Sequence, residues 1–460
     1  MKDLTQGPIF RQLIAMAAPI AAGMLLQTLY YVVDLYFVAQ LGDAALAGVG
    51  AAGTAMFVVF ALTQMLGVGT VALMSHAVGR KDRADANHVF NQSVALSALC
   101  AAITLGGGYG LSAPYMRWVG ADAATAAAGV TYLVWFTPGL ALQFALVAMG
   151  SALRGTGIVQ PTMIVQALTV VLNIVLAPVL IAGWGTGHSL GVAGAALAST
   201  ISIAAGVALM AVYFLRLEKY VEFDLAHWRP QLATWRRILD IGLPAGGEFA
   251  VMAIFMGVVY WIIRDFGAAA QAAFGIGSRV MQSIFLPAMA VAFAAAPIAG
   301  QNFGAGNAGR VRETFRAAAF ASCGIMAVLT LVCQWQAQWL IRAFTDDPAV
   351  IETGTQYLQI ISWNFVASGL VFTCSSLFQA LGNTWPSLLS SALRLLIFAL
   401  PAIWLSSRPG FELVQVWHLS VATVALQALV SLLLLRAQFR ARLGSLGRPA
   451  HATTGDGAPG

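Results

Sequence analysis

The sequence alternates long apolar runs with short breaks made of glycine, proline and charged residues. A helix needs about 20 mostly apolar residues to cross the hydrocarbon core of a membrane, and breaks of this kind mark where such helices end. The pattern predicts twelve membrane-spanning helices, over residues 12–38, 44–70, 88–112, 124–150, 161–183, 190–215, 236–263, 269–298, 314–337, 350–380, 386–406 and 413–435. We therefore expect an all-α, polytopic membrane protein.

Composition and motifs exclude several classes of protein. Of the 460 residues, 59% are apolar and 9% are charged, whereas about 25% of the residues of a soluble globular domain are charged. No run of the sequence matches the phosphate-binding pattern G-x-x-x-x-G-K-[ST], so we expect an ion gradient rather than nucleotide hydrolysis to supply energy. The six histidines are scattered along the chain, which argues against a membrane metalloenzyme.

Basic residues are distributed unequally between alternate loops. Eighteen Lys and Arg residues fall on the same side of the membrane as the N-terminus. Four fall on the other side, namely Arg117, Arg264, Arg342 and Arg408. Loops rich in Lys and Arg remain in the cytoplasm. We therefore expect both termini to be cytoplasmic, and the net charge of +6 needs no nucleic-acid partner to explain it.

The second half of the chain repeats the first at a constant offset of 225 residues. Identical residues recur at this offset in the pairs Pro19/Pro244, Gly42/Gly267, Gly50/Gly275, Gly79/Gly304, Phe90/Phe315, Arg117/Arg342, Asp122/Asp347, Gly129/Gly354, Tyr132/Tyr357, Gly157/Gly382 and Pro161/Pro386. A fixed offset of this kind indicates a duplicated unit. Because each unit holds six spans, the two repeats are parallel, which predicts two lobes around a central cavity.

The repeat also predicts the domain boundaries. We expect an N-terminal lobe over residues 1–215, a polar cytoplasmic linker over 216–235 and a C-terminal lobe over 236–437. Residues 438–460 are rich in Gly, Ala and Pro towards their end, and this composition predicts a disordered cytoplasmic tail.

Only two of the 18 acidic residues lie well inside predicted spans, Asp34 and Glu248. A carboxylate in a low-dielectric environment favours its protonated form, whereas a bound cation favours the ionised form. A proton and a cationic cargo would therefore compete for the same group, as coupled export requires. The alternative is permanent pairing with an intramembrane arginine. Arg279 and Arg394 offer this in the second lobe, whereas Asp34 has no basic residue in the spans of its own lobe.

Other polar residues could complete a binding site around Asp34. Gln27 lies seven residues before Asp34, so both project from one helical face, while Asn173, Ser199 and Thr200 lie in the fifth and sixth spans. The alternative for these residues is a role in helix packing. Aromatic rings in or near the spans could stack on a flat cation or anchor span ends at the interface, namely Tyr30, Tyr31, Phe136, Phe255, Tyr260, Trp261 and Trp363.

Three segments carry a resemblance to a known family. They are the run from Pro19 to Gly42, the run LNIVLAPVLI that contains Asn173, and PIAGQNFGAGNAGRVRE from Pro297 to Glu313. Together they resemble the multidrug and toxic compound extrusion (MATE) family, and the likeness covers about residues 8–437. The resemblance implies a V-shaped pair of lobes in a bacterial inner membrane. It also implies an antiporter that exports cationic or amphipathic drugs in exchange for protons or sodium. We expect the protein to act as a monomer and to need no cofactor besides the coupling ion.

Carried over residue by residue, the resemblance implies a first-lobe site made of Asp34, Asn173 and Gln27, with Ser199 or Thr200 nearby. The family often has a second Asp four residues after this Asn, where the present chain has Ala177. A sodium ion prefers more oxygen ligands than this set supplies, so proton coupling is favoured over sodium bound at Asp34 and Asn173. In the second lobe, Glu248 would act alone or with Arg279.

Two other functions remain open at this point. A related flippase of lipid-linked saccharides would share the two-lobed architecture, although such a carrier usually needs a strongly basic cavity for pyrophosphate. A channel is the other alternative, and the near-gapless duplication suits alternating access better than a continuous pore.

Overall fold

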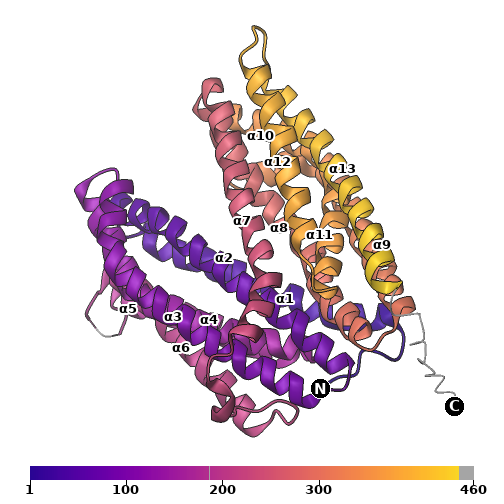
Figure 1. The fold of residues 1–460 in the computed structure, drawn as a ribbon. Coiled ribbons are helices and arrows are strands. Elements are labelled where there is room, and N and C mark those ends of the chain that lie inside the picture. The colour runs from indigo at the N-terminus through magenta and orange to yellow at the C-terminus, as the bar shows by residue number, and fades with distance from the viewer. Residues whose placement is uncertain (186, 445–460) are drawn as a thin grey trace, which may run out of the picture.

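The computed structural model describes residues 1–185 and 187–444, which are helical over most of their length (Figure 1). The helices are α1 (Ile9–Ala39), α2 (Asp43–Gly79), α3 (Arg83–Val119), α4 (Ala123–Gly155), α5 (Gln160–Ala182), α6 (Gly191–Arg216), α7 (Leu232–Ile263), α8 (Ala268–Gly304), α9 (Ala308–Arg342), α10 (Pro348–Ile361), α11 (Asn364–Ala380), α12 (Trp385–Ser406) and α13 (Leu413–Gln438). Short 3₁₀ turns cover Leu225–Trp228 and Arg264–Phe266, and a π-helical turn covers Phe439–Leu443.

Within the described residues, eleven helices are long and apolar enough to cross a membrane, and α10 and α11 pass the same test together. Counting this pair as one span gives the twelve predicted spans. The span predicted over 350–380 is nevertheless broken, because α10 and α11 meet at an angle of 55°. Side chains of α9 stabilise the break: the Thr330 hydroxyl donates to the carbonyl oxygen of Ser362 at 3.0 Å, and Gln334 Nε2 donates to its hydroxyl at 2.7 Å.

The helices form two lobes arranged as a V (Figure 1). We call α1–α6 the N lobe and α7–α13 the C lobe. The lobes meet near the N-terminus, where α1 and α2 pack against α7 and α8, and we call this the closed end. At the other end the lobes diverge, and we call this the open end. The expected two-lobed fold is confirmed.

The duplicated glycines Gly79 and Gly304 pack the closed end backbone to backbone. A Cβ on Gly79 would clash with the carbonyl oxygen of Gln301, and a Cβ on Gly304 would clash with that of His76. Positions 76 and 301 are themselves separated by the repeat offset, so each repeat makes the same contact with the other. The two glycines are therefore equivalent parts of one symmetric contact between α2 and α8.

The N-terminal segment links the two lobes at the closed end. Leu4 is fully buried, and its N–H donates to Gln301 Oε1 at 3.0 Å. Gln301 Nε2 donates in turn to the carbonyl oxygen of Gly155, at the end of α4, at 2.9 Å. Asn302 Nδ2 donates to the Leu4 carbonyl at 3.1 Å, and Arg310 Nε donates to Asn302 Oδ1 at 2.9 Å. The polar residues of the QNFGAGN segment thus fasten the N-terminus between the lobes.

Both aspartates of the repeat pair Asp122/Asp347 cap helices. Asp122 Oδ1 accepts a hydrogen bond from the N–H of Thr125 at 2.7 Å at the start of α4, and Asp347 Oδ1 accepts one from Ala349 at 2.9 Å at the start of α10. Such caps satisfy N–H groups that have no partner inside the helix. The same aspartate therefore recurs in both repeats because each copy caps the start of a helix.

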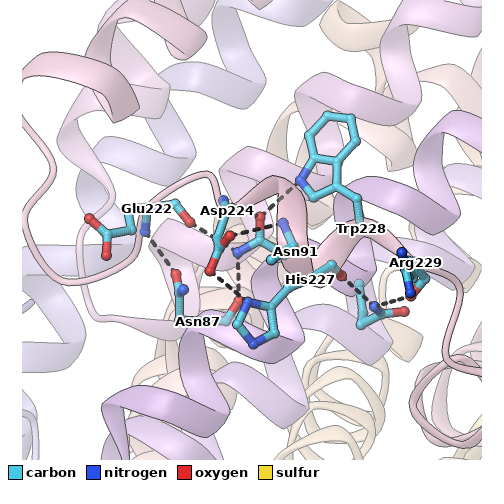
Figure 2. A network of polar contacts seen from close by, with 9 residues as sticks. Asn87, Asn91, Glu222, Asp224, His227, Trp228 and Arg229 are labelled. Carbon is cyan, nitrogen blue, oxygen red and sulfur yellow. Dashed lines mark hydrogen bonds and ion pairs between the residues drawn. The ribbon is translucent and has the colours of Figure 1, made fainter.

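The segment between α6 and α7 is fastened to α3 (Figure 2). Asn91 Oδ1 accepts hydrogen bonds from the Asp224 N–H at 2.9 Å and from Trp228 Nε1 at 3.0 Å. Gln92 Nε2 donates to the carbonyl oxygens of His227 and Arg229 at 2.6 and 2.9 Å. This connection belongs structurally to the N lobe, and it is shorter than the predicted 216–235 because α7 already begins at Leu232.

The predicted tail begins too early. The π-helical turn at 439–443 continues α13, Leu443 is buried, and Arg442 Nη1 donates to the Leu381 carbonyl at 2.5 Å. These contacts add residues 439–443 to the C lobe. The remainder of the predicted tail, residues 445–460, lies outside the described residues.

Candidate functional site

Asp34 lies on α1 and is almost completely buried, with 7% of its surface exposed. Its Oδ1 atom has no hydrogen-bond partner within residues 1–185 and 187–444. Tyr30 and Tyr31 precede Asp34 by four and three residues on the same helix, so their side chains lie near it on the surface of α1. The ion pairs found in the described part of the chain do not include Asp34. This is a carboxylate surrounded by neutral groups.

Polar groups from three helices of the N lobe meet at the Ser199 hydroxyl, and one of them, Tyr30, lies one helical turn before Asp34. The Tyr30 hydroxyl on α1 lies 2.5 Å from the Ser199 hydroxyl on α6, and Asn173 Nδ2 on α5 donates to the same Ser199 oxygen at 3.3 Å. Asn173 is fully buried, and its Oδ1 has no partner among the described residues. Tyr30 precedes Asp34 by one helical turn, so both side chains lie on one face of α1. We call Tyr30, Asp34, Asn173 and Ser199 the N-lobe polar cluster.

Tyr30 belongs to this cluster through its hydroxyl, whereas the sequence indicated only an aromatic ring for cation stacking or for anchoring a span end. Its spacing of four residues from Asp34 is the signal that identifies the hydroxyl. Two residues predicted for the site, Gln27 and Thr200, bond elsewhere. Gln27 instead accepts a hydrogen bond from Gln166 Nε2 on α5 at 3.4 Å. The Thr200 hydroxyl donates to the carbonyl oxygen of Trp135 on α4 at 2.9 Å. Gln27 and Thr200 therefore have their own partners beside the cluster.

Ala177 lies one turn after Asn173 on α5 and is fully buried. It belongs to an apolar group that includes Val38, Tyr132 and Phe136. The methyl side chain of Ala177 fits this packing. An apolar contact therefore occupies the position of a second carboxylate, and Asp34 is the acid of the N-lobe site, as the sequence indicated.

Glu248 on α7 is half-buried and interacts with the Ser387 hydroxyl on α12. Ser387 donates to Ser375 on α11 at 2.9 Å, and the hydroxyls of Ser390 and Ser431 lie 3.1 Å apart nearby along α12 and α13. A serine-lined seam between three helices thus accompanies the second acid. These serines carry no distinguishing signal in the sequence, because hydroxyls inside spans are common as packing contacts.

The two intramembrane arginines have different environments, and neither forms an ion pair with Glu248 in the part of the chain that the structure describes. Arg394 is half-buried, with its guanidinium 4.5 Å from the centre of the Phe255 ring. Arg279 is exposed and lines a cavity between α7 and α8. The suggested combination of Glu248 with Arg279 is therefore not formed. The described residues also hold no cluster of His, Cys, Asp and Glu suited to a metal ion.

Comparisons with known proteins agree with this architecture. The MatE family model matches residues 19–179 and again residues 244–405, and the two matches begin 225 residues apart, which is the offset of the internal repeat. The probable multidrug resistance protein YpnP of Bacillus subtilis is 27% identical over 422 residues, covering 90% of each chain. The FAD transporter of Shewanella oneidensis is 24% identical over 413 residues, covering 88% of this chain and 91% of its own. A solved MOP superfamily transporter from Pyrococcus furiosus shares the fold with a TM-score of 0.89 at 24% identity, covering 97% of this chain and 98% of its own.

Proposed function

Because this chain belongs to the MatE family of membrane transporters, we propose that it exports cationic or amphipathic small molecules in exchange for protons, with Asp34 as the coupling group. Its relatives include a probable multidrug resistance protein and an FAD transporter, and their cargoes differ. The nature of the cargo and of the coupling ion is therefore argued from the residues of the site. The observation that carries the proposal is the buried Asp34 carboxyl group, one oxygen of which has no hydrogen-bond partner in the described part of the chain.

An ionised carboxylate without a counter-charge is costly in a low-dielectric interior. Asp34 therefore needs a proton or a cation to be stable in its position. The Tyr30 hydroxyl, on the same face of α1 one turn before Asp34, can donate to the ionised form or accept from the protonated form. Binding of a cationic cargo favours release of the proton, and binding of a proton favours release of the cargo, which is the exchange that antiport requires.

The V shape supplies the alternating access that this exchange needs. The concentration of basic residues near both termini favours a cytoplasmic closed end, which makes the structure open to the outside of a bacterial inner membrane. Export would then require the lobes to separate at the closed end and to approach at the open end. We propose that this cycle operates in a monomer, since each chain carries both lobes of the cavity.

The test uses purified protein reconstituted in liposomes and the efflux of rhodamine 123, a cationic dye, at a clamped membrane potential. A pH step should drive export by the parent protein, and a sodium step should not. Asp34→Asn keeps the size of the side chain but removes the titration, so we expect a loss of pH-driven export by at least about tenfold. Glu248→Gln, the matched change in the second lobe, should retain most of it.

Two results would redirect the proposal. Export by Asp34→Asn at the parent rate would make Asp34 structural and move the coupling site to Glu248. A parent protein that responds to sodium and ignores pH would favour the sodium-coupled alternative, with the ion at Asp34 and Asn173. In the proton-coupled case, Ala177→Asp should add a carboxylate one turn from Asn173 and introduce a measurable sodium response.

A further inference from the structure

A cavity of about 450 Å³ lies between α7 and α8 and is separate from the N-lobe polar cluster. Residues that line it include Met256, Tyr260, Gln271, Ser278, Arg279 and Gln282. α7 forms the side of the C lobe that faces the N lobe (Figure 1), and nearer the closed end α7 contacts α2 while α8 contacts α1 and α2. The cavity therefore belongs to the wall of the V, on its open half.

Arg279 supplies the charge of this cavity. It lies eleven residues after Ala268, the first residue of α8, which places it about 16 Å along the helix at 1.5 Å per residue. Its side chain is exposed, and no acidic side chain of residues 1–185 and 187–444 forms an ion pair with it. A guanidinium exposed to lipid chains would be costly, and such groups instead face water-filled cavities.

The repeat shows that this charge is not part of the common framework of the lobes. The position equivalent to Arg279 in the first repeat is Thr54, and the position equivalent to Asp34 in the second is Val259. Among the described residues, the open half of the N lobe thus carries the acid Asp34 without an ion pair, and the open half of the C lobe carries the base Arg279 without one. Glu248 on α7 keeps an acid in the C lobe as well.

We propose that the Arg279 cavity binds the anionic group, a carboxylate or a phosphate, of an amphipathic cargo. A guanidinium donates two parallel hydrogen bonds to such a group, and the side chains of Gln271, Gln282 and Tyr260 supply further donors. Tyr260 is fixed edge-on against Phe274, with ring centres 5.0 Å apart. Gly275 leaves room for the Tyr260 hydroxyl, which lies 3.1 Å from the position that a Cβ would occupy.

This inference rests on the proposed function, because the cavity matters for transport only if the space between the lobes is the cargo route. It extends the cargo class from cations to zwitterions that carry an anionic group beside an aromatic ring. Asp34 in one wall and Arg279 in the other would then recognise opposite ends or faces of such molecules.

The experiment compares two dyes with the same ring system. Rhodamine 110 carries a free carboxylate, and rhodamine 123 is its methyl ester and therefore lacks that negative charge. Fluorescence anisotropy with the purified protein measures the Kd of each dye for the parent and for Arg279→Gln. We expect Arg279→Gln to weaken rhodamine 110 about tenfold, equivalent to about 1.4 kcal/mol, and to leave rhodamine 123 bound at least as tightly.

Two further variants sharpen the comparison. Arg279→Lys retains the charge without the fork, so it should bind rhodamine 110 with an intermediate Kd. Arg264 is another exposed arginine and lies outside the cavity, with its guanidinium carbon 4.9 Å from the centre of the Trp261 ring. Arg264→Gln should therefore leave both Kd values unchanged.

Three results would overturn the inference: no binding of rhodamine 110 by the parent, equal weakening of both dyes by Arg279→Gln, or no change in either. Equilibrium binding needs no ion gradient. A failure of proton coupling would therefore appear only in the export assay, whereas a failure of this inference would appear in the dye comparison.

Discussion

Replacing Gly304 with alanine should open the closed end of the V. The added Cβ would overlap the carbonyl oxygen of His76, which belongs to the backbone of α2. This carbonyl lies in the last turn of α2, where it accepts a hydrogen bond from the Arg80 N–H at 3.1 Å. It cannot rotate away without losing that bond, so the two helices must separate. Gly79→Ala should act in the same way from the other side, against the carbonyl of Gln301.

The magnitude follows from the cost of overpacking. Inserting a methyl group into a close-packed contact costs about 1–3 kcal/mol, and this cost applies only while the closed end is closed. The gain in helix propensity on replacing glycine applies to both conformations and cancels between them. A difference of about 2 kcal/mol changes the ratio of two conformations about 30-fold. If the parent protein rests mainly with this end closed, the Gly304→Ala and Gly79→Ala variants should therefore have a large population in which this end is open.

Double electron–electron resonance can measure this population. The four cysteines Cys100, Cys323, Cys333 and Cys374 would first be replaced, and spin labels placed through Gln40→Cys and Asp265→Cys at the exposed tips of the two lobes. The parent should give a long distance between the labels. Gly304→Ala and Gly79→Ala should add a shorter distance, because the open end approaches as the closed end separates.

Gly50→Ala is the matched control, since it lies on α2 in the open half and a Cβ there would meet nothing within 4 Å. It should leave the distance distribution unchanged. Parent-like distributions for both Gly304→Ala and Gly79→Ala would refute the rigid-body reasoning, as would an equal shift in Gly50→Ala.

Two further predictions concern polar groups. Gln301→Leu removes two hydrogen bonds that join the lobes, whereas Gln92→Leu removes bonds within the N lobe and its linker. At about 1 kcal/mol for each lost bond, both variants should lower the midpoint of thermal unfolding. Only Gln301→Leu should shift the distance between the spin labels, and an equal shift in both variants would contradict this reasoning. The Thr125 N–H and hydroxyl hold the pKa of Asp122 below its usual value. The stabilisation from this cap is therefore complete above the usual carboxyl pKa and is lost only as the pH falls through the lowered value. Between pH 5 and 8 Asp122 stays ionised. Asp122→Asn should therefore keep the parent pH profile of dye export. A displaced profile would contradict the assignment of Asp122 as a helix cap with no part in proton coupling.

The sequence alone determined the number of spans and the parallel repeat, and it singled out Asp34 as one of two acids inside the spans. These follow from properties that each segment carries by itself, because partition into lipid depends on the local density of apolar residues and a charge inside a span is costly wherever the span packs. The break between α10 and α11 could not be predicted from local hydropathy, because the sequence remains apolar through the bend and partners on α9 stabilise it.

Only the tertiary structure decided which polar groups meet. Tyr30 and Ser199 are 169 residues apart, and Leu4 and Gln301 are 297 apart, so their contacts depend on how helices from distant parts of the chain are oriented. The same holds for the two arginines, which look alike in sequence: Arg394 packs over Phe255, whereas Arg279 is exposed in a cavity. Hydropathy indicates which segments enter the membrane, but the direction in which each helix turns its few polar side chains is set by packing against its neighbours.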